Sequence, residues 1–242
     1  MKWRTNSEIH KWLPRLQAHR GYWVQGLQQN SLKSIVKAYE LKYEMAEFDV
    51  RLTKDQVVVL FHDEQYQGQK LDQMNFSELK EKTKKEFPHI STLEEVLIWL
   101  KKSGAGFKLN IEIKSKTIFD KRLEIRVNHL IQKYSTTELV LISSFNPFSL
   151  YRFRKMSPKI YRALLLTNDE GSNFILNRMW LNFLCLPDVL HLRYVDFDLQ
   201  KYSDVEVPIV LWTVNALSEI QDFQKVIYGV ISDRITPDSF FN

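Results

Sequence analysis

Residues 45–50 of this 242-residue chain read Met-Ala-Glu-Phe-Asp-Val, and residues 109–114 read Leu-Asn-Ile-Glu-Ile-Lys. Successive side chains of a β-strand point to opposite faces, so Glu47 and Asp49 lie on one face of the first stretch. Glu112 and Lys114 share one face of the second for the same reason. Most of the remaining residues are apolar. Each stretch therefore predicts a strand that presents two charged groups to one side.

Carboxylates in such apolar surroundings need an opposite charge close by. An isolated buried charge costs several kcal/mol even after the protein relaxes around it. Two strands that carry acids to one place therefore suggest a cation between them. Ligation by oxygen alone favours a hard divalent ion, Mg²⁺ or Ca²⁺ with Mn²⁺ as a further candidate, over zinc, which prefers histidine or thiolate.

Strand-like stretches alternate with amphipathic helical stretches along the whole chain. The strand candidates are residues 15–19, 45–50, 107–114, 139–145, 160–167, 189–194, 208–214 and 229–233. The helical candidates are residues 31–42, 92–102, 119–134, 147–156, 172–183 and 218–226. Eight strands separated by helices fit a closed parallel barrel. We therefore predict an α/β fold, the (β/α)8 TIM barrel, with an extra strand at 57–61 after the second barrel strand.

Polar motifs stand at or near the C-terminal ends of these strands, the face on which barrel active sites lie. His19-Arg20-Gly21 ends the first strand, and His62 follows the extra strand. Two histidines suit acid and base work at neutral pH, because imidazole titrates there. With three acids, an arginine and a lysine they form a set that can split a phosphate ester with a divalent metal. We therefore predict an enzyme.

The order of the motifs resembles one known family. The motifs are HRG at 19–21, E-x-D at 47–49, HD at 62–63, NIEIK at 110–114, SSF at 143–145, WTVN at 212–215 and GVISD at 229–233. Together they resemble the glycerophosphodiester phosphodiesterase family, in its compact bacterial cytoplasmic type. The resemblance runs from about His19 to Asp233. It implies a single domain over residues 1–242, a barrel of the phospholipase C-like phosphodiesterase type.

The resemblance implies the catalytic and phosphate-binding residues. His19 and His62 would trade general-acid and general-base roles across the scissile P–O bond. Arg20 and Lys114 would neutralise the non-bridging oxygens, since phosphoryl transfer depends mainly on positioning and charge stabilisation. The products would be glycerol 3-phosphate and an alcohol such as choline or ethanolamine. The sequence leaves open whether a hydroxyl of the substrate attacks first, giving a cyclic phosphate, or water attacks directly.

The metal ligands follow from the same resemblance, and the candidate pocket residues follow from where they stand in the chain. Glu47, Asp49 and Glu112 would hold the divalent cation. Phe145 and Trp212, at the ends of later predicted strands, are candidates for an apolar wall of the substrate pocket, and Gln29 is a further pocket candidate. Trp212 would lie beside a glycerol or lipid portion.

Two stretches depart from the family pattern. Where the family usually reads Pro-Glu-Asn-Thr, residues 28–31 read Gln-Gln-Asn-Ser, so the neutral Gln29 replaces an acid. If that acid orients Arg20 or a metal-bound water, its loss lowers activity or metal affinity. The Asn or Ser of this stretch still caps the following helix. Residues 64–91, where the family usually has a capping insertion, are short and dissimilar, and we interpret them as a reduced cap.

Composition fits a folded globular enzyme, with 44% hydrophobic and 26% charged residues. The single cysteine, Cys185, fits a reducing compartment. Residues 1–6 lack the apolar run of a signal peptide, and no stretch reaches the length of a membrane span. We therefore predict a cytoplasmic protein without an integral membrane segment. The oligomeric state is not determined by these features.

The net charge of +5 is compatible with nucleic acid, an anionic membrane or an anionic small substrate as partner. The basic residues are scattered, and aromatic residues are not interleaved with a basic stripe, which argues against nucleic acid. We therefore expect a small-molecule phosphodiester as the ligand.

Two alternatives remain beside glycerophosphodiester hydrolysis. One is a phospholipase D-like enzyme on the same fold, acting on lysophospholipids or sphingomyelin through the cleft that a reduced cap leaves open. A lipid substrate predicts an exposed apolar rim and turnover in micelles. The other is a catalytically silent barrel that binds phosphate ligands or a protein partner, which the neutral Gln29 favours and the retained histidines and acids oppose.

Overall fold

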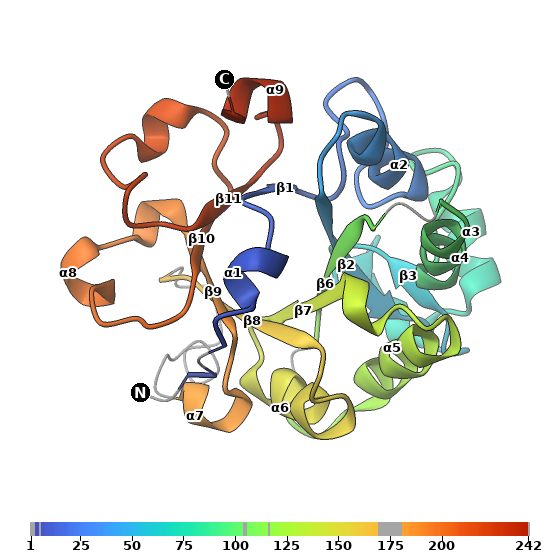
Figure 1. Cartoon of the computed structure of the whole chain (residues 1–242). Helices are drawn as coiled ribbons and strands as arrows, with labels where there is room; N and C mark the ends of the chain where they lie inside the picture. The colour runs from blue at the N-terminus through green and yellow to red at the C-terminus, as the bar shows by residue number, and fades with distance from the viewer. Residues whose placement is uncertain (1–2, 5, 104–105, 116, 169–180, 242) are drawn as a thin grey trace.

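The computed structural model describes residues 3–4, 6–103, 106–115, 117–168 and 181–241. Eight parallel strands form a closed barrel in the order β1-β2-β6-β7-β8-β9-β10-β11, with β11 paired to β1 (Figure 1). The barrel strands are β1 (Leu16–Ala18), β2 (Met45–Leu52), β6 (Lys108–Ile113), β7 (Val140–Ser144), β8 (Tyr161–Leu166), β9 (Val189–Arg193), β10 (Ile209–Trp212) and β11 (Gly229–Ser232). The predicted TIM barrel is therefore confirmed.

Strand β2 has different neighbours at its two ends. Near its N-terminal end it pairs with β1, in the register Ala18↔Ala46. Near its C-terminal end it pairs antiparallel with the short strand β3 (Val58–Leu60), in the register Val50↔Leu60. The predicted extra strand is thus present, and it brings the chain that follows β3 to the C-terminal mouth of the barrel.

Helices cover the outside of the barrel, and α1 (Ile9–Trp12) lies over its N-terminal opening (Figure 1). The longer covering helices are α2 (Leu32–Glu40), α4 (Leu93–Ser103), α5 (Arg122–Lys133) and α6 (Pro147–Met156). The shorter elements after β8 are α7 (Asn182–Cys185), α8 (Leu199–Tyr202), the 3₁₀ turns η4 (Tyr194–Asp196) and η5 (Leu217–Ile220), and α9 (Pro237–Phe241). A further 3₁₀ turn, η2 (Thr137–Leu139), precedes β7.

The core has two layers because each barrel strand is buried on both faces. Inside the barrel, Ile9, the first residue of α1, packs with Met45, Leu141, Val189 and Ile231. A larger cluster lies between the strands and the surrounding helices. Its helical members include Ile35, Leu97, Val127 and Phe153. Apolar residues thus fill both faces, and the interior near the C-terminal ends of the strands is left to polar side chains.

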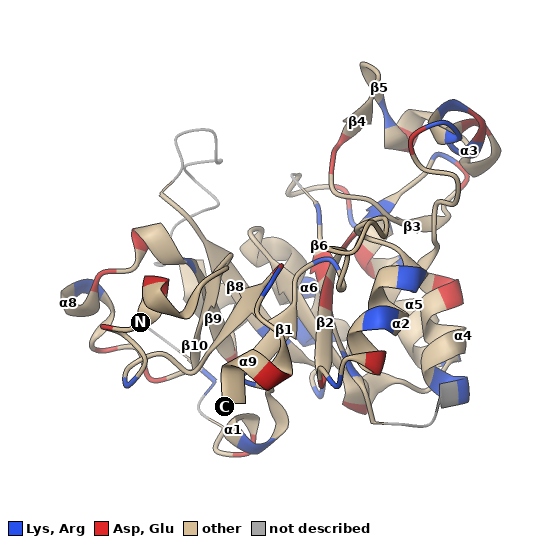
Figure 2. Ribbon diagram, turned by 90° about the horizontal axis from the view of Figure 1, so that it is seen from above, with Lys and Arg blue, Asp and Glu red and all other residues tan. Residues whose placement is uncertain are grey.

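The segment between β3 and α4 forms a small unit on the side of the barrel opposite α1 (Figure 2). It contains the hairpin β4 (Gln65–Tyr66) and β5 (Gln69–Lys70), the turn η1 (Leu71–Gln73) and α3 (Phe76–Thr83). Leu71, Met74 and Leu79 pack in one buried cluster with Val59 and Phe61. The unit is therefore anchored on β3.

The predicted strand bounds differ from the observed ones by at most two residues. Two helix predictions differ more. The helix expected from residue 119 begins at Arg122, and the one expected at 218–226 is only the 3₁₀ turn η5 followed by tight turns. There Phe223 and Val226 donate to the carbonyls three residues earlier, so the apolar spacing of this stretch is met without an α-helix. Most of the helix expected at 172–183 lies outside the described residues.

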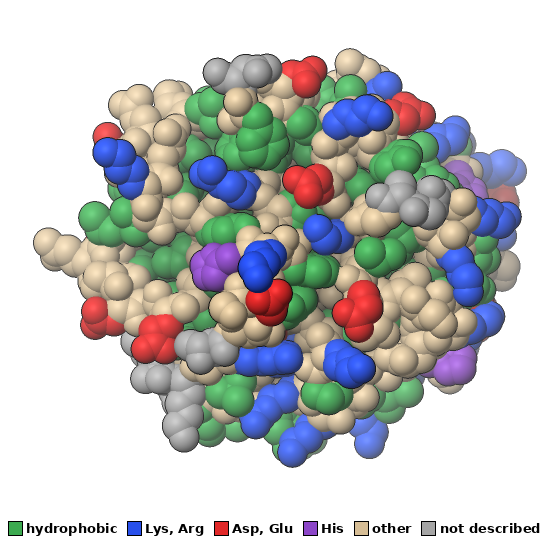
Figure 3. Space-filling model, in the orientation of Figure 1, with side chains coloured by type: hydrophobic (Ala, Val, Ile, Leu, Met, Phe, Trp, Pro, Cys, Tyr) green, Lys and Arg blue, Asp and Glu red, His purple; other side chains and the backbone are tan. Residues whose placement is uncertain are grey.

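None of the described helices is both long enough and apolar enough to cross a membrane. Figure 3 shows the face that carries α1, where basic side chains are spread among acidic and apolar ones. Cys185 is fully buried, and burial raises the pKa of its thiol to about 12.

Candidate active site

The chain turns sharply after β1, and this turn brings Arg20 over the end of β2. Gly21 has φ +74°, and a Cβ atom at this position would lie 2.4 Å from the Ser34 hydroxyl oxygen. The Gly21 N–H donates to the Glu47 carbonyl oxygen at 3.1 Å, and the Arg20 N–H donates to Glu47 Oε2 at 3.1 Å. Only glycine fits so close an approach in this backbone conformation. The glycine of the HRG motif therefore has a structural role that positions its two neighbours.

His19 is oriented from the far end of the chain. Its Nδ1 lies 2.7 Å from Asp233 Oδ1. Asn215 Nδ2 donates to the other oxygen of Asp233 at 3.1 Å, and the Asp233 N–H donates to Asn215 Oδ1 at 3.0 Å. A carboxylate only accepts, so we assign the proton to Nδ1 of His19. Nε2 is then available for proton transfer, and it lies 4.0 Å from Glu47 Oε2.

Three carboxylates converge below this histidine. Glu47 and Asp49 come from β2, and Glu112 comes from β6, which pairs with β2 in the register Asp49↔Glu112. One oxygen from each lies within 4.8 Å of the others, and all three side chains are buried. Burial and the neighbouring carboxylates raise the pKa of Glu47, and burial raises that of Glu112 to about 7 despite Lys114. When all three are ionised they repel one another, and positive charge placed between them stabilises the ionised forms.

Asp49 is the most firmly held of the three acids. Lys114 Nζ lies 3.1 Å from its Oδ1, and Arg20 Nε lies 3.4 Å from its Oδ2. Asn30 donates from Nδ2 to Asp49 Oδ2 at 2.8 Å and accepts the Asp49 N–H at 2.9 Å. Burial alone would raise the pKa of Asp49, but Lys114 and Arg20 hold it below its ordinary value. Lys114 also contacts Glu112 at 2.7 Å, so it bridges two of the acids.

The donor set suits a hard divalent cation. All three candidate ligands offer carboxylate oxygen, and they lie on rigid neighbouring strands. Mg²⁺ and Ca²⁺ prefer such ligands, and a bound cation would relieve the repulsion that raises two of the three pKa values. The residues therefore fit the ion that the sequence predicted, without distinguishing Mg²⁺, Ca²⁺ and Mn²⁺.

His62 stands at the rim, two residues after the end of β3. Its Nδ1 lies 2.8 Å from Asp63 Oδ1, and its carbonyl oxygen accepts from Arg51 Nε at 2.8 Å. Burial and Lys114 lower the pKa of His62, while Asp49 opposes them. As with the first histidine, the bond to a carboxylate leaves Nε2 as the free ring nitrogen.

The remaining candidates lie around this centre. Gln29 Oε1 accepts from Arg20 Nη1 at 3.0 Å, so the neutral side chain keeps contact with the guanidinium. Phe145 and Trp212 are half-buried and meet edge to face at 5.6 Å between ring centroids. Lys114 Nζ lies 5.9 Å from the Phe145 ring, which places that ring beside the charged centre.

Four residues of this arrangement were not singled out as site residues in the sequence. They are Asn30, Arg51, Asn215 and Asp233. The position of Asp233 in the sequence could have indicated a site residue, because it directly follows the last strand, at the mouth of the barrel. Asn30 was considered only as a possible helix cap, yet Ser31 caps α2 and Asn30 instead binds Asp49.

Comparison with known proteins places this arrangement in a family. The chain matches the model of the glycerophosphoryl diester phosphodiesterase family over residues 19–236. The chain belongs to this family. It is 32% identical over 160 residues to a glycerophosphodiester phosphodiesterase of Caldanaerobacter subterraneus subsp. tengcongensis, a match that covers 61% of this chain and 65% of that relative. The resemblance noted in the sequence is thereby confirmed.

Solved structures agree with the family assignment at the level of the fold. A putative glycerophosphodiester phosphodiesterase from Galdieria sulphuraria superposes with a TM-score of 0.77 at 20% identity, covering 95% of this chain and 97% of that one. An Oleispira antarctica phosphodiesterase, solved in complex with the product sn-glycerol-3-phosphate, gives a TM-score of 0.72 at 24% identity. That match covers 93% of this chain and 95% of that one.

Proposed function

We propose that this member of the family hydrolyses glycerophosphodiesters to glycerol 3-phosphate and an alcohol, using a divalent cation. The observation that carries the proposal is the convergence of three buried carboxylates with two histidines, each held through Nδ1 by an acid. Family membership supports the substrate class. The glycerol 3-phosphate in the Oleispira antarctica structure supports it further.

In this proposal the two histidines move the protons. Nε2 of one histidine takes the proton of the attacking oxygen, and Nε2–H of the other passes its proton to the leaving alcohol oxygen. The P–O bond to the attacking oxygen forms as the bond to the alcohol breaks. Asp233 and Asp63 keep His19 and His62 in the tautomer that exposes Nε2. The pair can thus serve either substrate-hydroxyl attack or direct water attack.

Charge stabilisation falls to the residues between the histidines. Glu47, Asp49 and Glu112 would hold the cation, which when bound acts as a Lewis acid toward the phosphoryl oxygens. Arg20 and Lys114 would neutralise the non-bridging oxygens, as their contacts with Asp49 aim both cations at the same point. Phe145 and Trp212 would cover the apolar side of the substrate.

The test is hydrolysis of glycerophosphocholine, glycerophosphoethanolamine and glycerophosphoglycerol with Mg²⁺, Ca²⁺, Mn²⁺ or EDTA. We expect metal-dependent release of glycerol 3-phosphate that is abolished in His19→Ala. The matched control is His129→Ala, because His129 is exposed on α5, away from the mouth of the barrel. No release from any diester with any metal would refute the proposal. Detection of a cyclic phosphate before glycerol 3-phosphate would identify the route through the substrate hydroxyl.

A phospholipase D-like activity on lysophospholipids is the second candidate, and one observation favours it. Phe119 is 93% exposed and Ile118 40% exposed, in the connection between β6 and α5 at the C-terminal mouth. Val24 and Val195, 43% and 55% exposed, lie in connections after β1 and β9 at the same mouth. An apolar rim of this kind suits a lipid aggregate. Turnover of micellar lysophospholipid that Phe119→Ser abolishes, without turnover of the soluble diesters, would favour this candidate.

We further propose that the unit between β3 and α4 acts as a reduced cap within a single domain, and that the protein works in the cytoplasm on a small phosphodiester. The packing of Leu71, Met74 and Leu79 against β3 supports the first point. Deletion of the hairpin at 65–70 should then change the KM values of the diesters relative to one another, with little change in the free energy of unfolding.

A further inference from the structure

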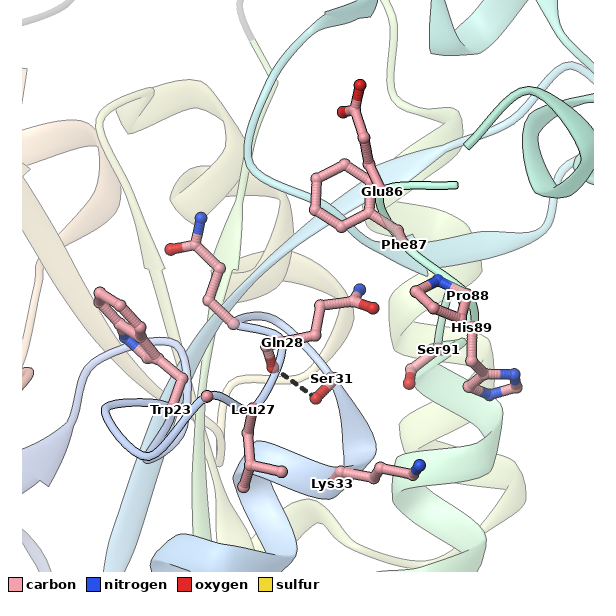
Figure 4. Close-up of a pocket in the computed structure, with 12 residues that line it drawn as sticks. Trp23, Leu27, Gln28, Ser31, Lys33, Glu86, Phe87, Pro88, His89 and Ser91 are labelled. Atoms are coloured by element: carbon pink, nitrogen blue, oxygen red, sulfur yellow. Dashed lines mark hydrogen bonds between the residues drawn. The ribbon is translucent and has the colours of Figure 1, made fainter. Parts of the chain in front are cut away.

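A cavity of about 440 Å³ lies beside the candidate active site, between the loop after β1 and the segment that precedes α4 (Figure 4). Trp23 stands on one side of it and Phe87 with Pro88 on the other, with Gln28 between them. The residues of this cavity have no role in the proton transfer or metal binding proposed above. Its size is that of a small-molecule subsite.

The cavity is connected to the phosphate-binding residues by a single hydrogen bond. Gln29 lines the cavity, and its Oε1 accepts from Arg20 Nη1 at 3.0 Å. The same guanidinium reaches Asp49 through Nε at 3.4 Å. A phosphodiester bound at Arg20 would therefore lie next to Gln29, and thus beside the cavity.

Most polar groups of the cavity are neutral, and its two charged residues, Glu86 and Lys33, carry opposite charges. Glu86 is the one carboxylate among its lining residues, it is hydrogen-bonded to Tyr66, and Figure 4 shows its carboxylate directed away from Gln28 and Trp23. The Lys33 side chain forms no hydrogen bond or ion pair within the described part of the chain, and Figure 4 shows its ammonium also directed away from Gln28 and Trp23. The amide of Gln28 likewise has no side-chain partner among the described residues. A ligand between Trp23 and Phe87 thus meets two amides and aromatic faces, with the charged groups of Lys33 and Glu86 directed away from it.

These groups discriminate between the alcohols that a glycerophosphodiester can carry. The aromatic faces alone would accept a quaternary ammonium. Arg20, which the lining residue Gln29 contacts, would repel it, and Glu86, the one carboxylate of the lining, is directed away from Gln28 and Trp23. A hydroxyl-rich neutral group suffers no such repulsion, and it can both donate to and accept from the amides of Gln28 and Gln29.

We propose that the cavity binds the alcohol half of the phosphodiester, and that its preferred occupant is a neutral polyol such as glycerol or a sugar alcohol. Choline and ethanolamine are then the poorer substituents. This inference rests on the proposed function for its link to the reaction. It makes Gln28 a residue that determines specificity rather than a catalytic one.

The experiment compares kcat/KM for glycerophosphoglycerol and glycerophosphocholine in the wild type and in Gln28→Leu, which keeps the volume and removes the amide. We expect the wild type to prefer glycerophosphoglycerol by tenfold or more. Gln28→Leu should lower its kcat/KM about fivefold, the typical effect of one neutral hydrogen bond, and leave glycerophosphocholine nearly unchanged. Gln28→Glu should raise kcat/KM for glycerophosphocholine severalfold. Gln224→Leu is the control, because Gln224 is exposed in the connection before β11.

Equal or better turnover of glycerophosphocholine by the wild type would overturn the inference, as would an equal effect of Gln28→Leu on both diesters. Calorimetric binding of both diesters to His19→Ala, with metal present, separates this failure from failure of the proposed function. If neither diester is hydrolysed but glycerophosphoglycerol binds more tightly and Gln28→Leu weakens it, the polyol site stands and the proposed activity falls. If neither binds, both fall.

Discussion

Asp233→Asn is the substitution that most directly tests the role of His19. In the native structure Asp233 accepts from His19 Nδ1 at 2.7 Å with one oxygen and from Asn215 Nδ2 at 3.1 Å with the other. The introduced amide has only one oxygen, and the Asn215 amide donates to it. Its NH₂ group must then face His19 Nδ1, which forces the ring proton onto Nε2.

The consequence holds for either catalytic role. As a base, His19 needs an unprotonated Nε2, and the introduced amide removes it. As an acid, it needs the imidazolium, which would then face a donor instead of a carboxylate. We expect kcat to fall about 100-fold to 1,000-fold, equivalent to roughly 3–4 kcal/mol in the activation free energy at ~1.4 kcal/mol per factor of ten. The effect should lie below that of a fully buried triad carboxylate, because Asp233 keeps 18% of its side chain exposed.

The assay is release of glycerol 3-phosphate at saturating diester and metal, with the thermal unfolding midpoint as the control for folding. Asp63→Asn at His62 provides the comparison. The Asp63 side chain is 73% exposed, so water can replace its bond to His62, and we expect a loss of less than about tenfold. A loss below threefold in Asp233→Asn, or one smaller than in Asp63→Asn, would refute the reasoning.

Three further substitutions test the supporting structure. Asn30→Ala should raise the metal concentration for half-maximal activity about 10-fold to 100-fold, because Asp49 loses two hydrogen bonds; an unchanged metal titration would contradict this. His191 is fully buried without a hydrogen-bond partner in the described chain, and burial lowers its pKa to about 3. The folded pKa lies below the unfolded value of ~6.5, so stability is complete above that pH and falls as the pH drops toward 3, by at most ~1.4 kcal/mol per unit. Urea titrations should therefore show that the free energy of unfolding falls by about 2 kcal/mol less in His191→Leu than in the wild type between pH 7 and pH 5. Equal decreases in the two proteins would contradict this prediction. Gly21→Ala should cost about 2–4 kcal/mol of unfolding free energy, since its Cβ would lie 2.4 Å from a side-chain oxygen of α2, whereas Gly26→Ala, with open space around it, should cost only about 1 kcal/mol; equal costs would show that crowding at Gly21 is unimportant.

The strands and the acidic centre were predictable because both depend on local pattern. Alternation along residues 45–50 assigns Glu47 and Asp49 to one face of the strand. In β2 that face points into the barrel, where Met45 of the same face packs. Position at the end of a strand predicted the mouth of the barrel for His19 and Lys114. The turns after η5 were not predictable, since three-residue and four-residue hydrogen bonding accommodate the same spacing of apolar residues.

The sequence by itself determined the barrel, the family and the residues that carry charge at its mouth, because each is encoded by alternation, strand ends and the order of motifs. Only the tertiary structure decided how these residues are held. His19 and Asp233 are 214 positions apart, and they meet because β11 closes the barrel beside β1. Asn30 reaches Asp49, and Gln29 reaches Arg20, through a turn whose direction depends on the packing of Gly21 against α2. Such contacts depend on closure of the barrel and on close packing between elements, which a pattern along one strand cannot contain.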